Sequence, residues 1–166
     1  LQVALRLRTL ADMGHTTDKV ELIVLGGTWT DYPQMYRFWF MRELFRALNE
    51  AGCKDAQEAS IAQRSTFYER CGIVRERDDL AAFARTEQGK ITRGESSYNQ
   101  AVRALYGENP SWQAAGARQE ATLADVEREH ERNAHAEHRS VGLVIETRPD
   151  CITAHSLTEM RALGAT

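Results

Sequence analysis

The sequence predicts an α/β fold built on parallel strands, and two apolar runs carry most of that prediction. Residues 20–25 and 141–145 are apolar at nearly every position, and each run stops abruptly at glycine or polar residues. A run that does not alternate is typical of a strand covered on both faces, as in a parallel sheet. The helical pattern that follows each run is the third observation, because strand, loop and helix in that order form a βα unit.

The first half of the predicted core begins with a helix over residues 1–13, where apolar side chains recur at helical spacing and Gly14 supplies a stop. The first strand follows. After it, Asp31 is a candidate N-cap and Pro33 a first-turn residue of the next helix. An apolar stripe then continues that helix to its end near Gly52.

The rest of the chain is less regular. Residues 53–118 show mixed charges and short helical patterns and are too long for an ordinary βα connection, which indicates a largely helical insertion. A charged helix over about 119–138, the second strand and a helix over about 155–163 come next. We therefore expect core segments 1–52 and 119–166. The chain starts inside a helical pattern and stops where the next strand is due, so we expect a fragment of a longer protein.

Composition excludes several classes of protein. With 166 residues, 42% of them hydrophobic, and a net charge of −3, the chain suits one domain with a real core and has no polybasic stretch for nucleic acid. Cys53, Cys71 and Cys151 lie far apart, which argues for the reducing cytoplasm and against a disulfide scaffold or a self-contained metal or iron–sulfur site. No stretch is long enough to cross a membrane, and no targeting segment is visible.

The candidate binding residues lie where the two strands end. Gly26, Gly27 and Thr28 follow the first strand, and paired glycines let a backbone approach a ligand without interference from Cβ. Glu146 and Arg148 follow the second strand. The carboxyl ends of parallel strands are where α/β folds place their ligands. The alternatives are a tight turn that needs glycine for its geometry and an ion pair that closes a strand end.

Two other groups of residues are weaker candidates. Glu127, Glu131, His135 and His138 share one face of the charged helix at a spacing that suits a metal, but a solvated helix with ion pairs explains them better, so we predict no metal ligands. An aromatic cluster over residues 29–40 is predicted to be mostly core. Its loop members Trp29 and Tyr32 are the exceptions that could stack on a base.

These motifs closely resemble the radical-SAM domain of the Elongator catalytic subunit and of its bacterial and archaeal homologues, which modify the wobble uridine of tRNA. The resemblance covers about residues 1–52 and 119–166. It rests on Gly14-His15, Asp18-Lys19-Val20-Glu21, Gly26-Gly27-Thr28, Pro33, Tyr36-Arg37 and residues 139–143 and 145–150.

The resemblance implies a partial (β/α) barrel that binds S-adenosylmethionine beside a [4Fe–4S] cluster. It also implies a 5′-deoxyadenosyl radical that abstracts hydrogen from the acetyl group of acetyl-CoA, and a carboxymethyl group added at C5 of the wobble uridine. Gly26, Gly27 and Thr28 match the loop that meets the methionine amino group, and Glu146 and Arg148 are expected to face the cofactor or substrate. No catalytic residue is assigned. The implied partners are tRNA and acetyl-CoA, with a homo-oligomer or Elongator-type partners also open.

The chain departs from the family pattern in several places. We expect the three cluster cysteines to lie upstream of Leu1 and the family's acetyltransferase domain to be missing from this chain. Trp29 replaces the usual Phe, and Ser140 replaces a frequent Cys. The isolated chain is therefore expected to be inactive and to bind S-adenosylmethionine weakly or not at all. The alternatives are a tRNA-binding or interaction module without a cluster, and a radical-SAM enzyme acting on another substrate.

Overall fold

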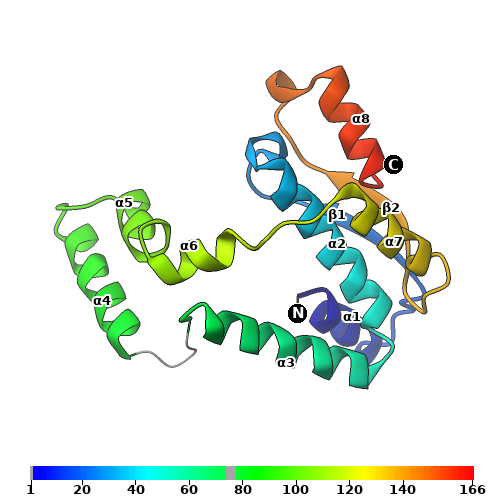
Figure 1. The fold of residues 1–166 in the computed structure, drawn as a ribbon, viewed down its shortest axis with the longest axis horizontal. Coiled ribbons are helices and arrows are strands. Elements are labelled where there is room, and N and C mark those ends of the chain that lie inside the picture. The colour runs from blue at the N-terminus through cyan, green and yellow to red at the C-terminus, as the bar shows by residue number, and fades with distance from the viewer. Residues whose placement is uncertain (1, 74–77) are drawn as a thin grey trace. The chain divides into compact units, whose positions relative to one another are not determined.

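The computed structural model of the protein describes residues 2–73 and 78–166, and these residues form two units (Figure 1). The first unit contains residues 1–61 and 119–166, and the second contains residues 62–118. The sequence predicted a helical insertion that starts at residue 53, whereas the second unit starts at residue 62. The role of the second unit as an insertion in a larger domain stays a prediction.

The first unit contains one strand pair and the helices that pack on it. The α-helices are α1 (Gln2–Asp12), α2 (Gln34–Glu50), α7 (Leu123–Asn133) and α8 (Ala154–Ala162). The strands are β1 (Lys19–Val24) and β2 (Arg139–Ile145), and short 3-10 turns follow them at η1 (Trp29–Asp31) and η3 (Pro149–Cys151). Helix α3 (Lys54–Arg70) starts in this unit and continues into the second.

Strands β1 and β2 pair in parallel, which confirms the predicted α/β class. The register runs from Lys19 opposite Arg139 to Val24 opposite Ile145, with an irregularity after Val20 where β2 carries one extra residue. The bulge increases the local twist without changing which face the later pairs share. The partial (β/α) barrel that the family resemblance implies remains a prediction.

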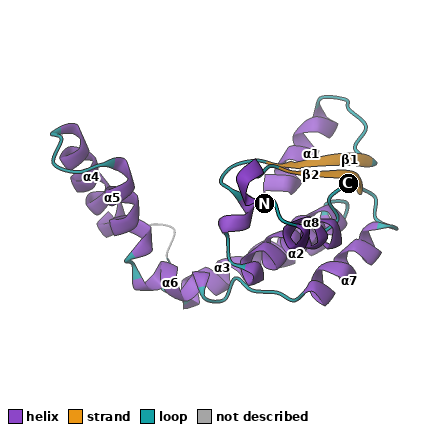
Figure 2. Ribbon diagram, turned by 90° about the horizontal axis from the view of Figure 1, so that it is seen from above, coloured by secondary structure: helices purple, strands orange, loops and turns teal. Residues whose placement is uncertain are grey.

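The core lies between the strand pair and the helices α2, α7 and α8, which Figure 2 shows together on one side of the strands. Helix α1 packs against α2 and contributes Leu7. The apolar stripe of α2 supplies the largest share of the buried side chains. The core residues are Leu7, Trp29, Phe38, Met41, Phe45, Leu48, Ala121, Val126, Leu143, Met160 and Leu163.

The opposite face of the strands is exposed, so the prediction of strands covered on both faces is wrong for the described residues. Leu22 and Leu143 point toward the helices, whereas their neighbours Ile23 and Val144 are 57% and 43% exposed. Leu25 and Val141 are also exposed. Continuous apolar runs indicate that both faces can be buried, but they do not say by which segment.

Several predicted boundaries shift for identifiable reasons. Helix α1 ends at Asp12, and Gly14 adopts a positive φ of 85° just after it, as expected; Leu1 lies outside the described residues. Asp31 is not the N-cap of α2, because it belongs to η1 and Pro33 takes the cap position. The charged helix starts later and ends earlier than predicted. A capping box at Thr122 begins α7. The side chain of its last residue, Asn133, forms hydrogen bonds with the backbone of His138 and Ser140, beyond the end of the helix.

Helices are the only regular secondary structure in the described residues of the second unit. Its elements are the end of α3, α4 (Asp78–Thr92), α5 (Tyr98–Val102), the π-turn η2 (Arg103–Gly107) and α6 (Pro110–Gly116). Ser97 forms a capping box with Gln100 at the start of α5, and Asn109 caps α6. Trp112 packs on Tyr106 with ring centroids 5.4 Å apart. Within the described part of the chain, no helix has the length and apolar character needed to cross a membrane.

Candidate functional site

The two predicted binding loops leave the strand pair at the same edge. The backbone N–H of Glu146 donates to the Val24 carbonyl over 3.0 Å, so the parallel ladder continues one step beyond β2. The Gly26–Gly27–Thr28 turn therefore begins beside the Glu146–Arg148 segment. We call the residues 25–32 and 146–151 together the carboxyl-edge loops. Their functional roles remain predictions, but the structure places all five predicted binding residues in them.

The glycine turn combines a backbone conformation that favours glycine with open space. Gly26 has φ of +144°, a conformation that L side chains rarely adopt, and nothing lies within 4 Å of the position its Cβ would occupy. At Gly27 an added Cβ would lie 2.9 Å from the hydroxyl oxygen of Tyr32. The first glycine is thus needed for its dihedral angles and the second for a close approach. Open backbone of this kind can present amide and carbonyl groups to a ligand.

The residues after the glycines turn back into the core. The Asp31 N–H donates to the Thr28 carbonyl over 3.0 Å and closes η1. Trp29 is only 3% exposed and packs against Phe40, with ring centroids 5.8 Å apart. Its proposed role in stacking on a base is therefore wrong. Tyr32 is 40% exposed and keeps a solvent-facing ring at the same turn.

Glu146 and Arg148 do not pair with each other. Arg148 binds the neighbouring Asp150, through its Nε at 3.0 Å from Oδ1 and through a second contact from Nη2 to Oδ2. Both partners are largely exposed. The Glu146 carboxylate is exposed and has no hydrogen-bond or ion-pair partner among the described residues. A free carboxylate next to an open glycine turn can accept a hydrogen bond from a cationic group of a ligand.

Sequence reasoning missed a group of buried polar atoms in the same loops. Four buried side-chain N or O atoms in the described chain lack a hydrogen-bond partner, and three of them belong to the carboxyl-edge loops: Trp29 Nε1, Thr30 Oγ1 and Thr147 Oγ1. Such atoms are rare in folded proteins because each costs about 1–3 kcal/mol of desolvation. No local pattern signals them, since burial of a threonine hydroxyl depends on tertiary packing.

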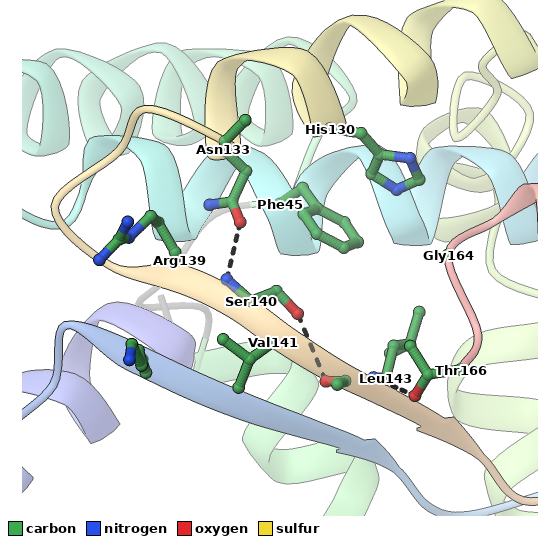
Figure 3. A pocket seen from close by; sticks show the side chains of 12 residues that line it. Phe45, His130, Asn133, Arg139, Ser140, Val141, Leu143, Gly164 and Thr166 are labelled. Atoms are coloured by element: carbon green, nitrogen blue, oxygen red, sulfur yellow. Dashed lines mark hydrogen bonds between the residues drawn. The ribbon is translucent and has the colours of Figure 1, made fainter.

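The fourth such atom, His130 Nε2, lies beside a pocket of about 410 Å³ along the outer edge of β2. In Figure 3, His130 and Phe45 point from α7 and α2 toward the strand, and Gly164 closes the other side. Burial lowers the pKa of His130, and a backbone hydrogen bond to Leu163 and the charge of Glu127 offset this only in part. None of the five predicted binding residues lines this pocket.

The two histidines that share a helical spacing with Glu127 and Glu131 lie outside the helix in the structure. Helix α7 ends at Asn133, so His135 and His138 lie beyond it. His138 is buried, and its Nδ1 is hydrogen-bonded to the Thr17 carbonyl at 2.7 Å. Across residues 2–73 and 78–166, no three His, Cys, Asp or Glu side chains are arranged to hold a metal ion.

Comparison with known proteins supports the family resemblance, although no protein-family model matches the chain. The chain is 36% identical over 88 residues to a tRNA uridine(34) acetyltransferase from Dehalococcoides mccartyi (strain CBDB1), which covers 52% of this chain and 19% of that protein. It is 32% identical over 106 residues to Elongator complex protein 3 of Mus musculus, covering 64% of this chain and 19% of the mouse protein.

A shorter match, 44% identical over 54 residues, relates 32% of this chain to 10% of Elongator complex protein 3 of Schizosaccharomyces pombe. The chain thus spans about a fifth of the length of the first two relatives. These matches confirm the resemblance to this family that the motifs indicate.

Proposed function

We propose that this chain, as a relative of the tRNA uridine(34) acetyltransferases and Elongator complex protein 3, supplies part of the cofactor-binding region of an enzyme that modifies the wobble uridine of tRNA. The observation that carries the proposal is structural. The two loops that hold the family-like motifs emerge together at the carboxyl edge of one parallel strand pair. Parallel α/β sheets bind their ligands at this edge.

The carboxyl-edge loops fit the methionine part of S-adenosylmethionine. That group carries an ammonium and a carboxylate, and the loops offer an unpaired carboxylate at Glu146 and a guanidinium at Arg148. The open backbone at Gly26 supplies further donors and acceptors. When bound, S-adenosylmethionine supplies radical or group-transfer chemistry that side chains do not provide.

Each of the five candidate binding residues has a distinct role in this proposal. Gly26 and Gly27 present backbone groups to the ligand ammonium, and the Thr28 hydroxyl adds a neutral acceptor. Because Thr28 carries no charge, Glu146 supplies the negative charge that an ammonium needs in a partly buried site. Arg148 binds the ligand carboxylate and must loosen its contact with the exposed Asp150 to do so.

A [4Fe–4S] cluster does not fit the described residues. Cys53 is exposed, Cys71 is buried in the other unit and Cys151 lies in η3, so they do not form a three-thiolate set. We assign no step of cluster chemistry to this chain. The further parts of the proposal are a carboxymethyl product at C5 of uridine 34, acetyl-CoA as donor, and tRNA or Elongator-type partners in the cytoplasm.

The proposal is tested by replacing Glu146 with Gln in the native gene of the source organism. Nucleosides from total tRNA are then quantified by mass spectrometry, and tRNA affinity is measured by filter binding. Because Glu146→Gln removes the charge but little volume, we expect the modified wobble uridine to fall at least about tenfold, which corresponds to one charge-assisted hydrogen bond. The affinity for tRNA should stay unchanged.

Glu127→Gln on the exposed side of α7 is the matched control and should retain the modification. Unchanged nucleoside levels in Glu146→Gln would refute the cofactor-binding role. Loss of tRNA affinity together with the modification would favour a binding module instead, since the loops would then contact RNA.

A further inference from the structure

Helices α2 and α8, which follow the two strands, are joined by a nearly buried ion pair. Arg37 Nε donates to Glu159 Oε1 over 2.6 Å, and the two side chains are 14% and 8% exposed. Gln34 Nε2 donates to the other carboxylate oxygen, Glu159 Oε2, over 2.7 Å. The carboxylate is therefore held at both oxygens by the first turns of α2.

The same guanidinium also holds the loop after β1. Arg37 Nη1 donates to the carbonyl of Tyr32, and it lies 3.4 Å from the carbonyl of Thr30. Tyr32 in turn places its hydroxyl over Gly27. A continuous chain of contacts thus runs from Glu159 on α8 through Arg37 to the glycine turn.

The electrostatics agree with a carboxylate that stays charged. Burial by itself raises the pKa of Glu159, but hydrogen bonds from Arg37 and Gln34 and the nearby positive charges outweigh it, so the pKa lies below its ordinary value. Arginine suits this place better than lysine, because one planar group can bind a carboxylate and backbone carbonyls at the same time.

We infer that Arg37 and Glu159 are positioning residues that fix the Gly26–Tyr32 turn in its ligand-facing conformation. This inference rests on the proposed function for its purpose, but its structural content is independent of any ligand. An ion pair that only ties two helices would have no effect on the backbone of the turn.

The first test compares Glu159→Gln with Glu129→Gln by hydrogen–deuterium exchange of the whole chain. The two carboxylates are matched, since Glu129 on α7 binds one arginine, Arg132, and one amide, Asn49, in contacts of 2.7–2.9 Å. In Glu159→Gln we expect peptides covering residues 25–33 to exchange about tenfold faster, because local opening governs exchange. Glu129→Gln should leave those peptides unchanged.

The second test separates positioning from helix pairing and remains informative if Glu159→Gln is poorly folded. The double variant Arg37→Glu/Glu159→Arg restores an ion pair between α2 and α8, but a carboxylate at position 37 cannot donate to the Thr30 and Tyr32 carbonyls. We expect the thermal midpoint to recover relative to either single variant, while fast exchange of residues 25–33 persists.

Three outcomes would overturn the inference: normal exchange of the turn in Glu159→Gln, equal loosening in Glu129→Gln, or full protection of the turn in the double variant. The result for Glu146→Gln distinguishes the two proposals. Loosening of the turn in Glu159→Gln together with unchanged tRNA modification in Glu146→Gln supports the positioning pair and counts against the proposed cofactor-binding role.

Discussion

The two ends of the strand pair are built in opposite ways. At the amino end, the Asn133 amide donates to the Asn49 side chain and the His138 carbonyl and accepts from the Ser140 N–H, all at 2.8–3.0 Å. At the carboxyl end, three buried polar atoms and the Glu146 carboxylate lack partners among the described residues, and Gly26 has a φ that L side chains rarely adopt. Proteins tolerate such local conflicts mainly at functional sites. We therefore expect the amino end to contribute to stability, and the carboxyl end is where we propose that a ligand binds.

The largest expected effect is at the amino end. Asn133→Ala removes three hydrogen bonds and leaves the His138 carbonyl and the Ser140 N–H without their partner, so the free energy of unfolding should fall by about 3 kcal/mol. Urea denaturation followed by circular dichroism measures it. Asn99→Ala, at an exposed position on α5, is the control and should change stability by less than about 0.5 kcal/mol. A similarly small loss in Asn133→Ala would remove the basis for the contrast between the two ends.

The next effect concerns Gly26, the positive-φ glycine of the carboxyl end. Gly26→Ala should cost about 1–2 kcal/mol, because the φ of +144° disfavours any side chain even though space for a Cβ is open. Gly116→Ala also has open space but no positive φ, and at the end of α6 it should be neutral or stabilising by up to about 1 kcal/mol. Thermal unfolding of both variants checks the pair. If they behave alike, the φ of Gly26 does not disfavour a side chain.

A third experiment tests whether the His130 imidazole, on the helix side of β2, makes the free energy of unfolding depend on pH. Burial lowers the pKa of His130 in the folded protein, so the unfolded chain binds the proton more readily. Stability is then complete above the unfolded pKa of about 6.5 and falls as the pH drops below it, with a slope of at most about 1.4 kcal/mol per pH unit. Denaturation between pH 5 and 8 should show this slope in wild type.

The slope should disappear in His130→Leu, which keeps an apolar side chain against Phe45. His15→Leu, at an exposed loop position, should keep the slope of the wild type. A His130→Leu profile identical to that of the wild type would mean that this imidazole does not control acid stability.

The smallest expected effect has the opposite sign. Thr147→Val removes a buried hydroxyl that has no partner, so stability should stay the same or rise by up to about 1 kcal/mol. Thr153→Val is the contrasting control, because the Thr153 hydroxyl accepts from the Ser156 N–H and caps α8; its loss should cost about 1 kcal/mol. A clear destabilisation in Thr147→Val would show that this hydroxyl is satisfied within the fold.

The sequence allowed prediction of the parts of the fold that depend on local pattern. The apolar runs, the glycine stop at Gly14 and the strand–loop–helix order all gave the correct elements, and the strand ends correctly located the carboxyl-edge loops. These features depend on side-chain spacing along one segment, which a single sequence displays directly.

The missed features depend on contacts between distant segments. Helix α7 was predicted to reach residue 138, but the Asn133 side chain bonds to His138 and Ser140, beyond the turn that follows, and the helix ends early. The Arg37–Glu159 pair joins residues with no common motif. Trp29 was expected to be free to stack on a base because it lies in the loop after the first strand, yet its ring packs on α2. Tertiary packing decided each of these outcomes.

The pairing of Lys19 with Arg139 also has a consequence for synthesis on the ribosome. Translation at about 5–20 residues per second leaves β1 without its partner for roughly ten seconds, whereas helices form within microseconds. Helices α2 and α3 and the whole second unit are therefore complete before β2 exists. The nascent chain must keep the apolar side chains of β1 shielded during this interval, and the strand pair that carries the candidate site is among the last elements to assemble.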